Sequence, residues 1–173
     1  KTGGQIKNFD PSNFFKSKQV GRMDRFSLFA LLAANEAITT SGLKTCKEDW
    51  SENAGIILGS SIGGIETINY SYKQVFEEGH NRLHPLTIPK IMNNSATSLI
   101  SIEYQIQGPS FTVSSACSSA NHAMGLAYET IKSRKSEVMI TGGSESFLSF
   151  GGIKPWESLR VLSQSKCRPF SKG

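Results

Sequence analysis

Three short apolar runs, separated by segments with helical patterning, constrain the fold of this chain most strongly. They cover residues 54–60, 111–113 and 137–143. The first and the third have the length and the continuous apolar character of strands that are buried on both faces of a sheet. The middle run consists of strand-forming residues bounded by small ones. Strands that alternate with helices predict an α/β fold, in which a mixed or parallel sheet lies between layers of helices.

Helices are predicted where apolar residues recur at every third or fourth position. The strongest pattern extends from Arg22 to Thr40 and is followed by Ser41-Gly42, a typical helix stop. Residues 1–21 are expected to be irregular, and residues 144–173 to be loop-rich with short helical pieces. The other predicted helices extend from the glycines at 63–64 to about Glu78, over most of Ile88 to Ile106, and from Cys117 to about Lys135.

The composition is that of a globular domain with a core of its own. Of the 173 residues, 38% are hydrophobic. No apolar run approaches the roughly 20 residues that a membrane-spanning helix needs, and we expect no signal peptide. The three cysteines, Cys46, Cys117 and Cys167, are an odd number without metal-ligand spacing. They predict a reducing, cytoplasmic environment rather than a disulfide framework.

The net charge of +5 is compatible with a mildly acidic partner. The basic residues are scattered along the chain, however, and a solvated surface explains most of this charge. Neither a nucleic acid nor a membrane is therefore expected as a partner.

Cys117 is the candidate nucleophile. It follows a turn at Gly108-Pro109 and a short strand, and we expect a helix to start at the cysteine itself. The positive end of a helix dipole and free backbone N–H groups would favour the thiolate, which is the nucleophilic form. The same N–H groups could hold an oxyanion during acyl transfer. A buried cysteine that serves only for packing fits the local pattern equally well.

The other polar motifs are better explained by structure than by chemistry. The run Gly59–Gly64 lacks the spacing of a phosphate-binding loop and predicts a close backbone approach or a narrow ligand channel. Glu145, at a strand end, is expected to anchor a loop by hydrogen bonds. His122 lies five residues after Cys117, about 140° away around a helix, so a core or interface histidine is favoured over a general base. His80 and His84 are expected at the surface.

The motifs together resemble the β-ketoacyl-acyl-carrier-protein synthases of the thiolase superfamily, specifically the elongating type II enzymes. The similarity covers nearly the whole chain, and Gly-Pro-Ser followed shortly by Ala-Cys-Ser-Ser is its most specific part. The segments that resemble the family, in its order, are 22–26, 58–64, 108–110, 115–119, 138–145 and 167–173.

This resemblance implies a thiolase-like fold, which consists of two similar halves, each a sheet between helix layers. Residues 1–173 are expected to form part of the first half, without its opening strand. The second half, which supplies two histidines and a lysine in the family, is absent from these residues. The histidines serve the loss of CO₂ from malonyl-carrier protein, so the chain matches the nucleophile but not the decarboxylation site.

The resemblance also implies the reaction and its site residues. Cys117 would accept an acyl group from acyl-carrier protein and condense it with malonyl-carrier protein, with no cofactor or metal. Residues in the positions of the family's acyl channel are Ile62, Gly152 and Trp156, and a partner subunit of a homodimer would complete the channel near Thr87 and Ile88. Basic residues that could receive the acidic carrier protein are Arg82 and Arg160, with Lys18, Arg22 and Arg25 as further candidates. Arg22 and Arg25 could equally be scaffold residues.

Three other functions remain open. A polyketide or specialised-lipid ketosynthase would use the same nucleophile on a different acyl chain. A truncated module that binds acyl-carrier protein without catalysis would explain the missing histidines. A cysteine hydrolase is disfavoured, since no histidine is placed to activate Cys117.

Overall fold

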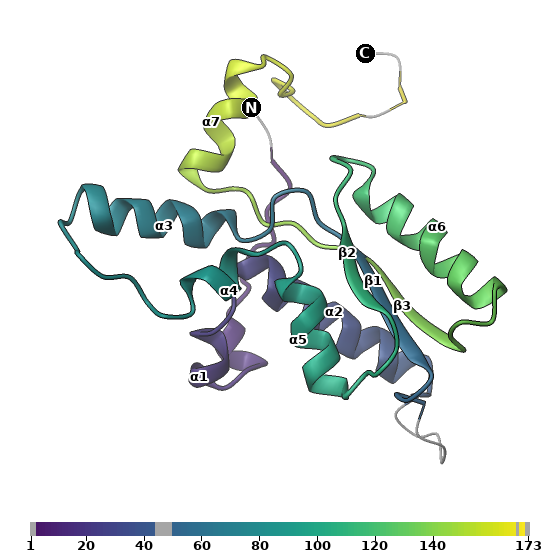
Figure 1. Ribbon diagram of the computed structural model, residues 1–173. Coiled ribbons are helices and arrows are strands. Elements are labelled where there is room, and N and C mark those ends of the chain that lie inside the picture. Colours follow the sequence, from purple (N-terminus) through teal and green to yellow (C-terminus); the bar gives the residue numbers. More distant parts are fainter. Residues whose placement is uncertain (1–2, 44–49, 169, 172–173) are drawn as a thin grey trace.

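A parallel sheet of three strands forms the centre of the computed structural model, which describes residues 3–43, 50–168 and 170–171 (Figure 1). The strands are β1 (Ala54–Gly59), β2 (Ser110–Val113) and β3 (Val138–Gly143), in the order β2-β1-β3. The sequence predicted a mixed or a parallel sheet, and the described strands form a parallel one. Cys46 lies outside the described residues.

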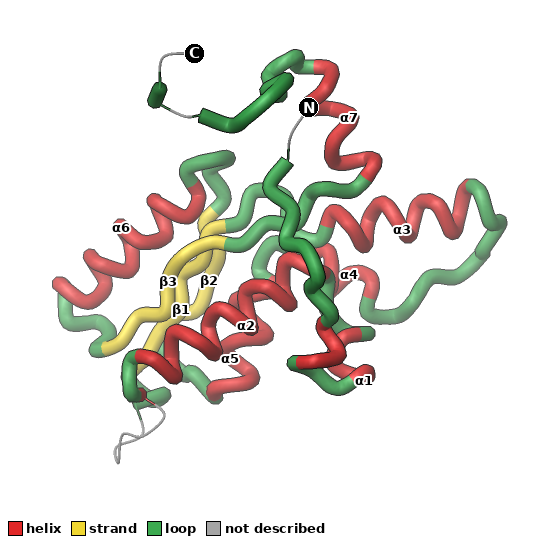
Figure 2. Tube along the Cα trace, turned by 180° about the vertical axis from the view of Figure 1, so that it is seen from behind, coloured by secondary structure: helices red, strands yellow, loops and turns green. Residues whose placement is uncertain are grey.

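Helices cover both faces of the sheet. Helix α6 (Ser119–Lys132) lies on one face, while α2 (Arg25–Thr40) and α5 (Ser95–Tyr104) lie on the other (Figures 1 and 2). The fully buried central strand β1 serves both layers because successive side chains of a strand point to opposite faces. Ile56 packs in the core on the side of α2 and α5, and Ile57 packs against Ala123 and Ala127 of α6. The predicted α/β layering is therefore confirmed.

The remaining elements refine the predicted boundaries. Helix α3 (Ile65–Phe76) follows β1, and α7 (Phe150–Ser158) is the short helical piece expected near the end. The segment 88–106 is mostly helical, as predicted, but it consists of two helices, α4 (Thr87–Ile91) and α5, which the extended backbone of Met92 separates. The first 21 residues are less irregular than predicted, because they contain a 3-10 turn at Pro11–Asn13 and the short helix α1 (Ser17–Val20). No helix in the described part of the chain combines the length and the apolar character needed to span a membrane.

Helix α2 begins at Arg25 rather than Arg22 because Asp24 caps it. The carboxylate of Asp24 is buried, and one oxygen accepts a hydrogen bond from the backbone N–H of Phe26 at 3.2 Å. The other oxygen accepts from the backbone N–H and the hydroxyl of Thr67, at 2.8 and 2.6 Å. Since Thr67 belongs to α3, this one side chain joins the starts of two helices.

We expect Asp24→Ala to lower the free energy of unfolding by about 3 kcal/mol, because it removes a helix cap and leaves buried donors unsatisfied. Thermal and denaturant unfolding of the protein would measure the loss. Asp10→Ala is the matched control: Asp10 also caps a helical turn and accepts from the Ser12 N–H at 2.9 Å, but it is exposed. Equal melting temperatures for the two variants would contradict the role assigned to Asp24.

Candidate active site

The loops that follow the three strands meet at one edge of the sheet, because the strands are parallel and end in register. Gly59, the last residue of β1, is paired with Val113 of β2 on one side and with Gly143 of β3 on the other. Carboxyl ends of parallel strands are the usual location of ligand and active sites in α/β folds. Cys117 lies in the loop after β2 and is therefore at this edge.

Cys117 lies in a tight turn before α6, not at the first residue of a helix as predicted. The helix begins at Ser119. Ala116 has a left-handed backbone with φ +52°, which turns the chain sharply just before the cysteine. Serine hydroxyls hold this turn: Ser118 donates to the carbonyl of Ser115 at 2.8 Å, and Ser119 donates to that of Ala116 at 2.6 Å. The turn leaves the thiol of Cys117 exposed, so in this structure it is not a core packing residue.

Two glycines let the start of α6 lie directly against the strand ends. A Cβ atom at Gly59 would lie 2.3 Å from the backbone nitrogen of Ala120, and one at Gly143 would lie 2.7 Å from the Cβ of Ala120. Any side chain at Gly59 would thus displace the first turn of α6 and, with it, Cys117. The glycine run after β1 serves close backbone approach, as predicted. At its end, a Cβ at Gly64 would lie 2.4 Å from the carbonyl oxygen of Lys90.

Glu145 anchors the loop after β1, as predicted. One carboxylate oxygen accepts hydrogen bonds from the hydroxyl of Ser60 at 3.0 Å and from the backbone N–H of Ile62 at 3.3 Å. The backbone N–H of Ser61 donates to the same oxygen. The loop after β3 therefore holds the loop after β1 at the edge where Cys117 lies.

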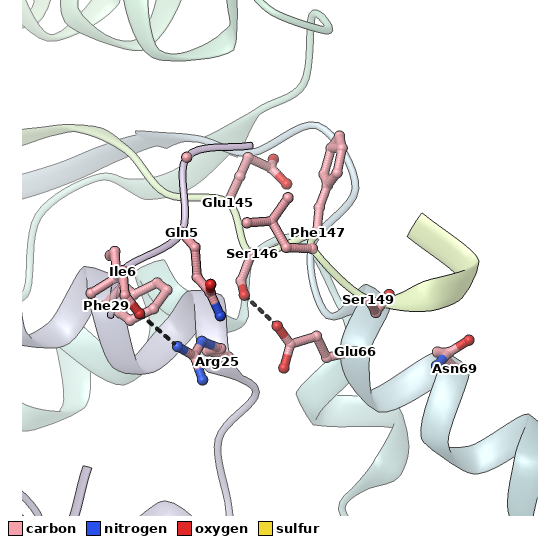
Figure 3. Close-up of a pocket in the computed structure, with 12 residues that line it drawn as sticks. Gln5, Ile6, Arg25, Phe29, Glu66, Asn69, Glu145, Ser146, Phe147 and Ser149 are labelled. Carbon is pink, nitrogen blue, oxygen red and sulfur yellow. Dashed lines mark hydrogen bonds between the residues drawn. The ribbon is translucent and has the colours of Figure 1, made fainter. Parts of the chain in front are cut away.

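A hollow of about 270 Å³ opens beside Cys117 and is lined by residues from all three loops and from the first turn of α6, including Ser61, Ala116 and Ser144. A larger cavity of about 550 Å³ lies farther along the same edge (Figure 3). Its walls are the segment 4–6, side chains of α2 and α3, and residues 145–149.

The described residues that line the larger cavity do not include Cys117, and several polar groups of the cavity are paired within the chain. Ser146 donates to Glu66 at 2.6 Å, and the Arg25 guanidinium donates to the carbonyl of Ile6 at 3.4 Å, as Figure 3 shows. The hollow beside Cys117 is therefore the candidate active site.

The structure describes all three histidines, and none of them is hydrogen-bonded to the thiol of Cys117 there. Nδ1 of His122 is 2.7 Å from the hydroxyl of Ser115. This side chain is exposed, so of the two predicted locations the core is wrong in the described structure, and the interface stays a prediction. The surface location predicted for His80 and His84 is confirmed; Nδ1 of His84 accepts from the backbone N–H of Leu86 at 3.1 Å.

The described residues that line the hollow include none of those predicted to line an acyl channel. Ile62 directly follows Ser61, which lines the hollow, and is 38% exposed. Gly152 is buried in α7, where Trp156 stacks on Phe147 with ring centroids 5.7 Å apart. Ile88 lies in α4, just after Thr87, and is 63% exposed. The acyl channel therefore stays a prediction.

The two arginines predicted to contact the carrier protein lie on different segments of this structure. Arg82 is exposed in the loop between α3 and α4, and Arg160 is exposed just after α7. These two segments lie apart in both overall views (Figures 1 and 2). Arg22 and Arg25 were predicted either to receive the carrier protein or to be scaffold residues. Arg25 is a scaffold residue, because its guanidinium lies 5.6 Å from the ring of Phe9 and 5.1 Å from that of Phe29.

Two contributors to the site were not predicted from the sequence. The hydroxyl of Ser61 donates to the carbonyl of Ala116 at 2.8 Å and so joins the first loop to the cysteine turn. The side-chain amide of Asn93 donates to the carbonyls of Ser60 and Ser61, at 3.4 and 3.3 Å. The only signal in the sequence was the small, polar character of the run after β1.

Comparison with known proteins shows the family to which this sequence is similar. A model of the family "Beta-ketoacyl synthase, N-terminal domain" matches residues 1–173. Nodulation protein E from a Rhizobium species is 40% identical over 169 residues, which cover 98% of this chain and 42% of that protein. The 3-oxoacyl-[acyl-carrier-protein] synthase 2 of Staphylococcus aureus is 32% identical over 175 residues, covering 98% and 43%.

Solved structures show the same fold. A type II PKS ketosynthase, in complex with its acyl-carrier protein and bound to a hexaketide, matches with a TM-score of 0.80 and 26% identity, over 88% of this chain and 43% of that one. A β-ketoacyl synthase from Burkholderia phymatum matches with a TM-score of 0.76 and 26% identity, over 91% and 38%. The predicted thiolase-like fold is thereby confirmed. The chain spans about two fifths of the length of the curated relatives it matches.

Proposed function

The chain belongs to the β-ketoacyl synthase family, and from this membership we propose that the protein is a decarboxylating condensing enzyme in which Cys117 carries the acyl group. The observation that carries the proposal is the exposed thiol of Cys117, which a strained turn presents beside a hollow at the carboxyl edge of the sheet. An exposed cysteine in such a place suits covalent catalysis.

The first step transfers an acyl group to the enzyme. The thiolate of Cys117 attacks the carbonyl carbon of an acyl thioester on acyl-carrier protein. The new bond between the carbonyl carbon and Sγ forms as the bond to the carrier's sulfur breaks, and the carrier thiolate leaves and takes up a proton. A backbone N–H at the turn, that of Cys117 itself, stabilises the oxyanion.

The second step forms the carbon–carbon bond. Malonyl-carrier protein loses CO₂, and the electron pair of the broken bond becomes a carbanion at the α-carbon. This carbon attacks the acyl group on Cys117, the bond to Sγ breaks, and the thiolate is restored. The product is a 3-oxoacyl-carrier protein that is two carbons longer. By resemblance, histidines of the family's second half, which is not part of residues 1–173, assist the loss of CO₂.

Fatty-acid synthesis is the proposed setting, and the 3-oxoacyl-[acyl-carrier-protein] synthase 2 relative supports it. A polyketide or specialised-lipid pathway is the second candidate. It is supported by the match to a polyketide ketosynthase. Both candidates share Cys117 and differ in the acyl chain.

Acyl-carrier protein is the proposed partner, with Arg82 and Arg160 as proposed contacts. The solved complex of a similar ketosynthase with its carrier protein supports this partner. A homodimer and a cytoplasmic location are also proposed; the predictions for them come from the family resemblance and the cysteine pattern respectively.

The test is reconstitution of the condensation with the full-length protein, an acyl-carrier protein series of increasing acyl length, and malonyl-carrier protein. We expect one CO₂ released for each 3-oxoacyl product, and the preferred acyl group will separate the two pathways. A folded protein that binds acyl-carrier protein but forms no product would instead support the non-catalytic module.

Ile62 gives a prediction about chain length. We expect Ile62→Phe to lower kcat/KM for the longest accepted acyl chain by about 10- to 100-fold and to leave short chains unaffected, because added bulk in an apolar channel excludes methylenes. A series of acyl-carrier proteins measures the effect. Ile102→Phe is the matched control, at an isoleucine of α5 that is 74% exposed. An unchanged chain-length profile for Ile62→Phe would count against the channel position.

A further inference from the structure

Glu145 is the carboxylate among the described residues that line the hollow, and the proposed reaction gives it no role. It lines both the hollow beside Cys117 and the larger cavity of Figure 3. One of its carboxylate oxygens accepts hydrogen bonds from three consecutive residues, Ser60, Ser61 and Ile62. A charged acceptor with several donors makes a strong and directional anchor.

We propose that Glu145 is a positioning residue for Cys117, which acts through the loop after β1. The proposal rests on the function proposed above. In the described structure the hydrogen bonds of this carboxylate go to residues 60–62, so its effect on the thiol is indirect.

The loop after β1 is itself hydrogen-bonded to the segment 114–117, which contains Cys117. The hydroxyl of Ser61 donates to the carbonyl of Ala116 at 2.8 Å, and that of Ser114 donates back to the carbonyl of Ser61 at 3.4 Å. Asn93 holds the loop from the other side through the carbonyls of Ser60 and Ser61. Ser61 is thus fixed by Glu145 and Asn93, and it fixes Ala116.

Ala116 needs such support because its left-handed backbone, with φ +52°, is unfavourable for a residue with a side chain. Its carbonyl oxygen accepts from two hydroxyls, those of Ser61 and Ser119. The Ser119 contact is local to the turn, whereas the Ser61 contact depends on Glu145. Loss of the Glu145 anchor should therefore let the turn relax and move the thiol from its reactive position.

The experiment compares Glu145→Leu and Glu145→Gln in the full-length protein. For transfer of the acyl group from acyl-carrier protein to Cys117, we expect Glu145→Leu to lower kcat about 100-fold at an unchanged KM, since a misplacement of about 1 Å can cost that much. Glu145→Gln should recover most of the loss because its amide oxygen can accept from the same donors. Glu66→Gln, at the wall of the larger cavity alone, is the matched control and should leave kcat unchanged.

A double-mutant cycle tests the route through Ser61. Ser61→Ala alone should lower kcat by less than Glu145→Leu, and the double variant should be no slower than Glu145→Leu, because both changes break the same chain of contacts. Additive losses would overturn the proposal, as would a folded Glu145→Leu with the kcat of the wild type. If Glu145→Leu does not fold, the glutamine variant and Ser61→Ala still decide: wild-type kcat in Ser61→Ala would overturn the proposal.

Alkylation of Cys117 by iodoacetamide, measured across pH, separates this proposal from the proposed function. It reports how the thiol is presented without any acyl chemistry. A wild-type protein that is alkylated but never acylated would refute the function alone. Identical alkylation profiles for the wild type and Glu145→Leu would refute the positioning role alone.

Discussion

Cys117→Ala is expected to reduce condensation to the background rate while the protein stays folded. The substitution removes the atom that forms the acyl thioester, and no neighbouring group can replace it. Because the side chain is exposed in the described structure and makes no core contact, the melting temperature should remain close to that of the wild type. Steady-state formation of the 3-oxoacyl product measures the first effect, and thermal unfolding measures the second.

Cys167→Ala is the matched control for this prediction. Cys167 is the other free and exposed cysteine among the described residues, and its loss should leave the condensation rate unchanged. Product formation by Cys117→Ala at a measurable fraction of the wild-type rate would exclude this residue as the nucleophile.

Gly59→Ala should lower the condensation rate by about 100-fold or more. The new Cβ would lie 2.3 Å from the backbone nitrogen of Ala120, so the first turn of α6 must move away from the sheet and take Cys117 with it. The same overpacking should cost about 1–3 kcal/mol of the free energy of unfolding. Activity and denaturant unfolding measured on the same preparation would show both losses.

Gly21→Ala controls for the general effect of replacing a glycine. Its backbone has φ −60°, and its nearest neighbour would lie at an ordinary contact distance of 3.7 Å. It should keep both activity and stability. If Gly59→Ala keeps wild-type activity, close packing of α6 on the strand ends does not position the thiol.

The order of strands and helices was predictable from sequence because it depends on local patterns. The apolar runs at 54–60 and 137–143 correspond to β1 and β3 within one residue. The start of α2 was placed three residues early, at Arg22, although an aspartate just before the helix is a typical cap. The break between α4 and α5 was not predictable, because Asn93 leaves the helix to bond the loop after β1, over 30 residues earlier in the chain.

The anchoring role of Glu145 was predictable from a carboxylate at a strand end. The local pattern around Cys117 fitted a nucleophile and a packing residue equally well, and only the family resemblance favoured the nucleophile. The contact between Ser61 and Ala116 joins residues 55 positions apart, and no local pattern encodes it. The geometry assumed for His122 was wrong in its premise, since α6 starts at Ser119 and leaves Cys117 in a turn. The histidine instead pairs with Ser115, which lies outside the helix.

The central claim is that Cys117 accepts the acyl group, and single-turnover acylation tests it most directly. The full-length protein would be mixed with a medium-chain acyl-carrier protein in the absence of malonyl-carrier protein, and the modified peptide identified by mass spectrometry. The account predicts one acyl group per chain, on the peptide that contains Cys117, and its release as the 3-oxoacyl product when malonyl-carrier protein is added. An acyl group on any other residue, or a folded protein that forms no adduct, would contradict it.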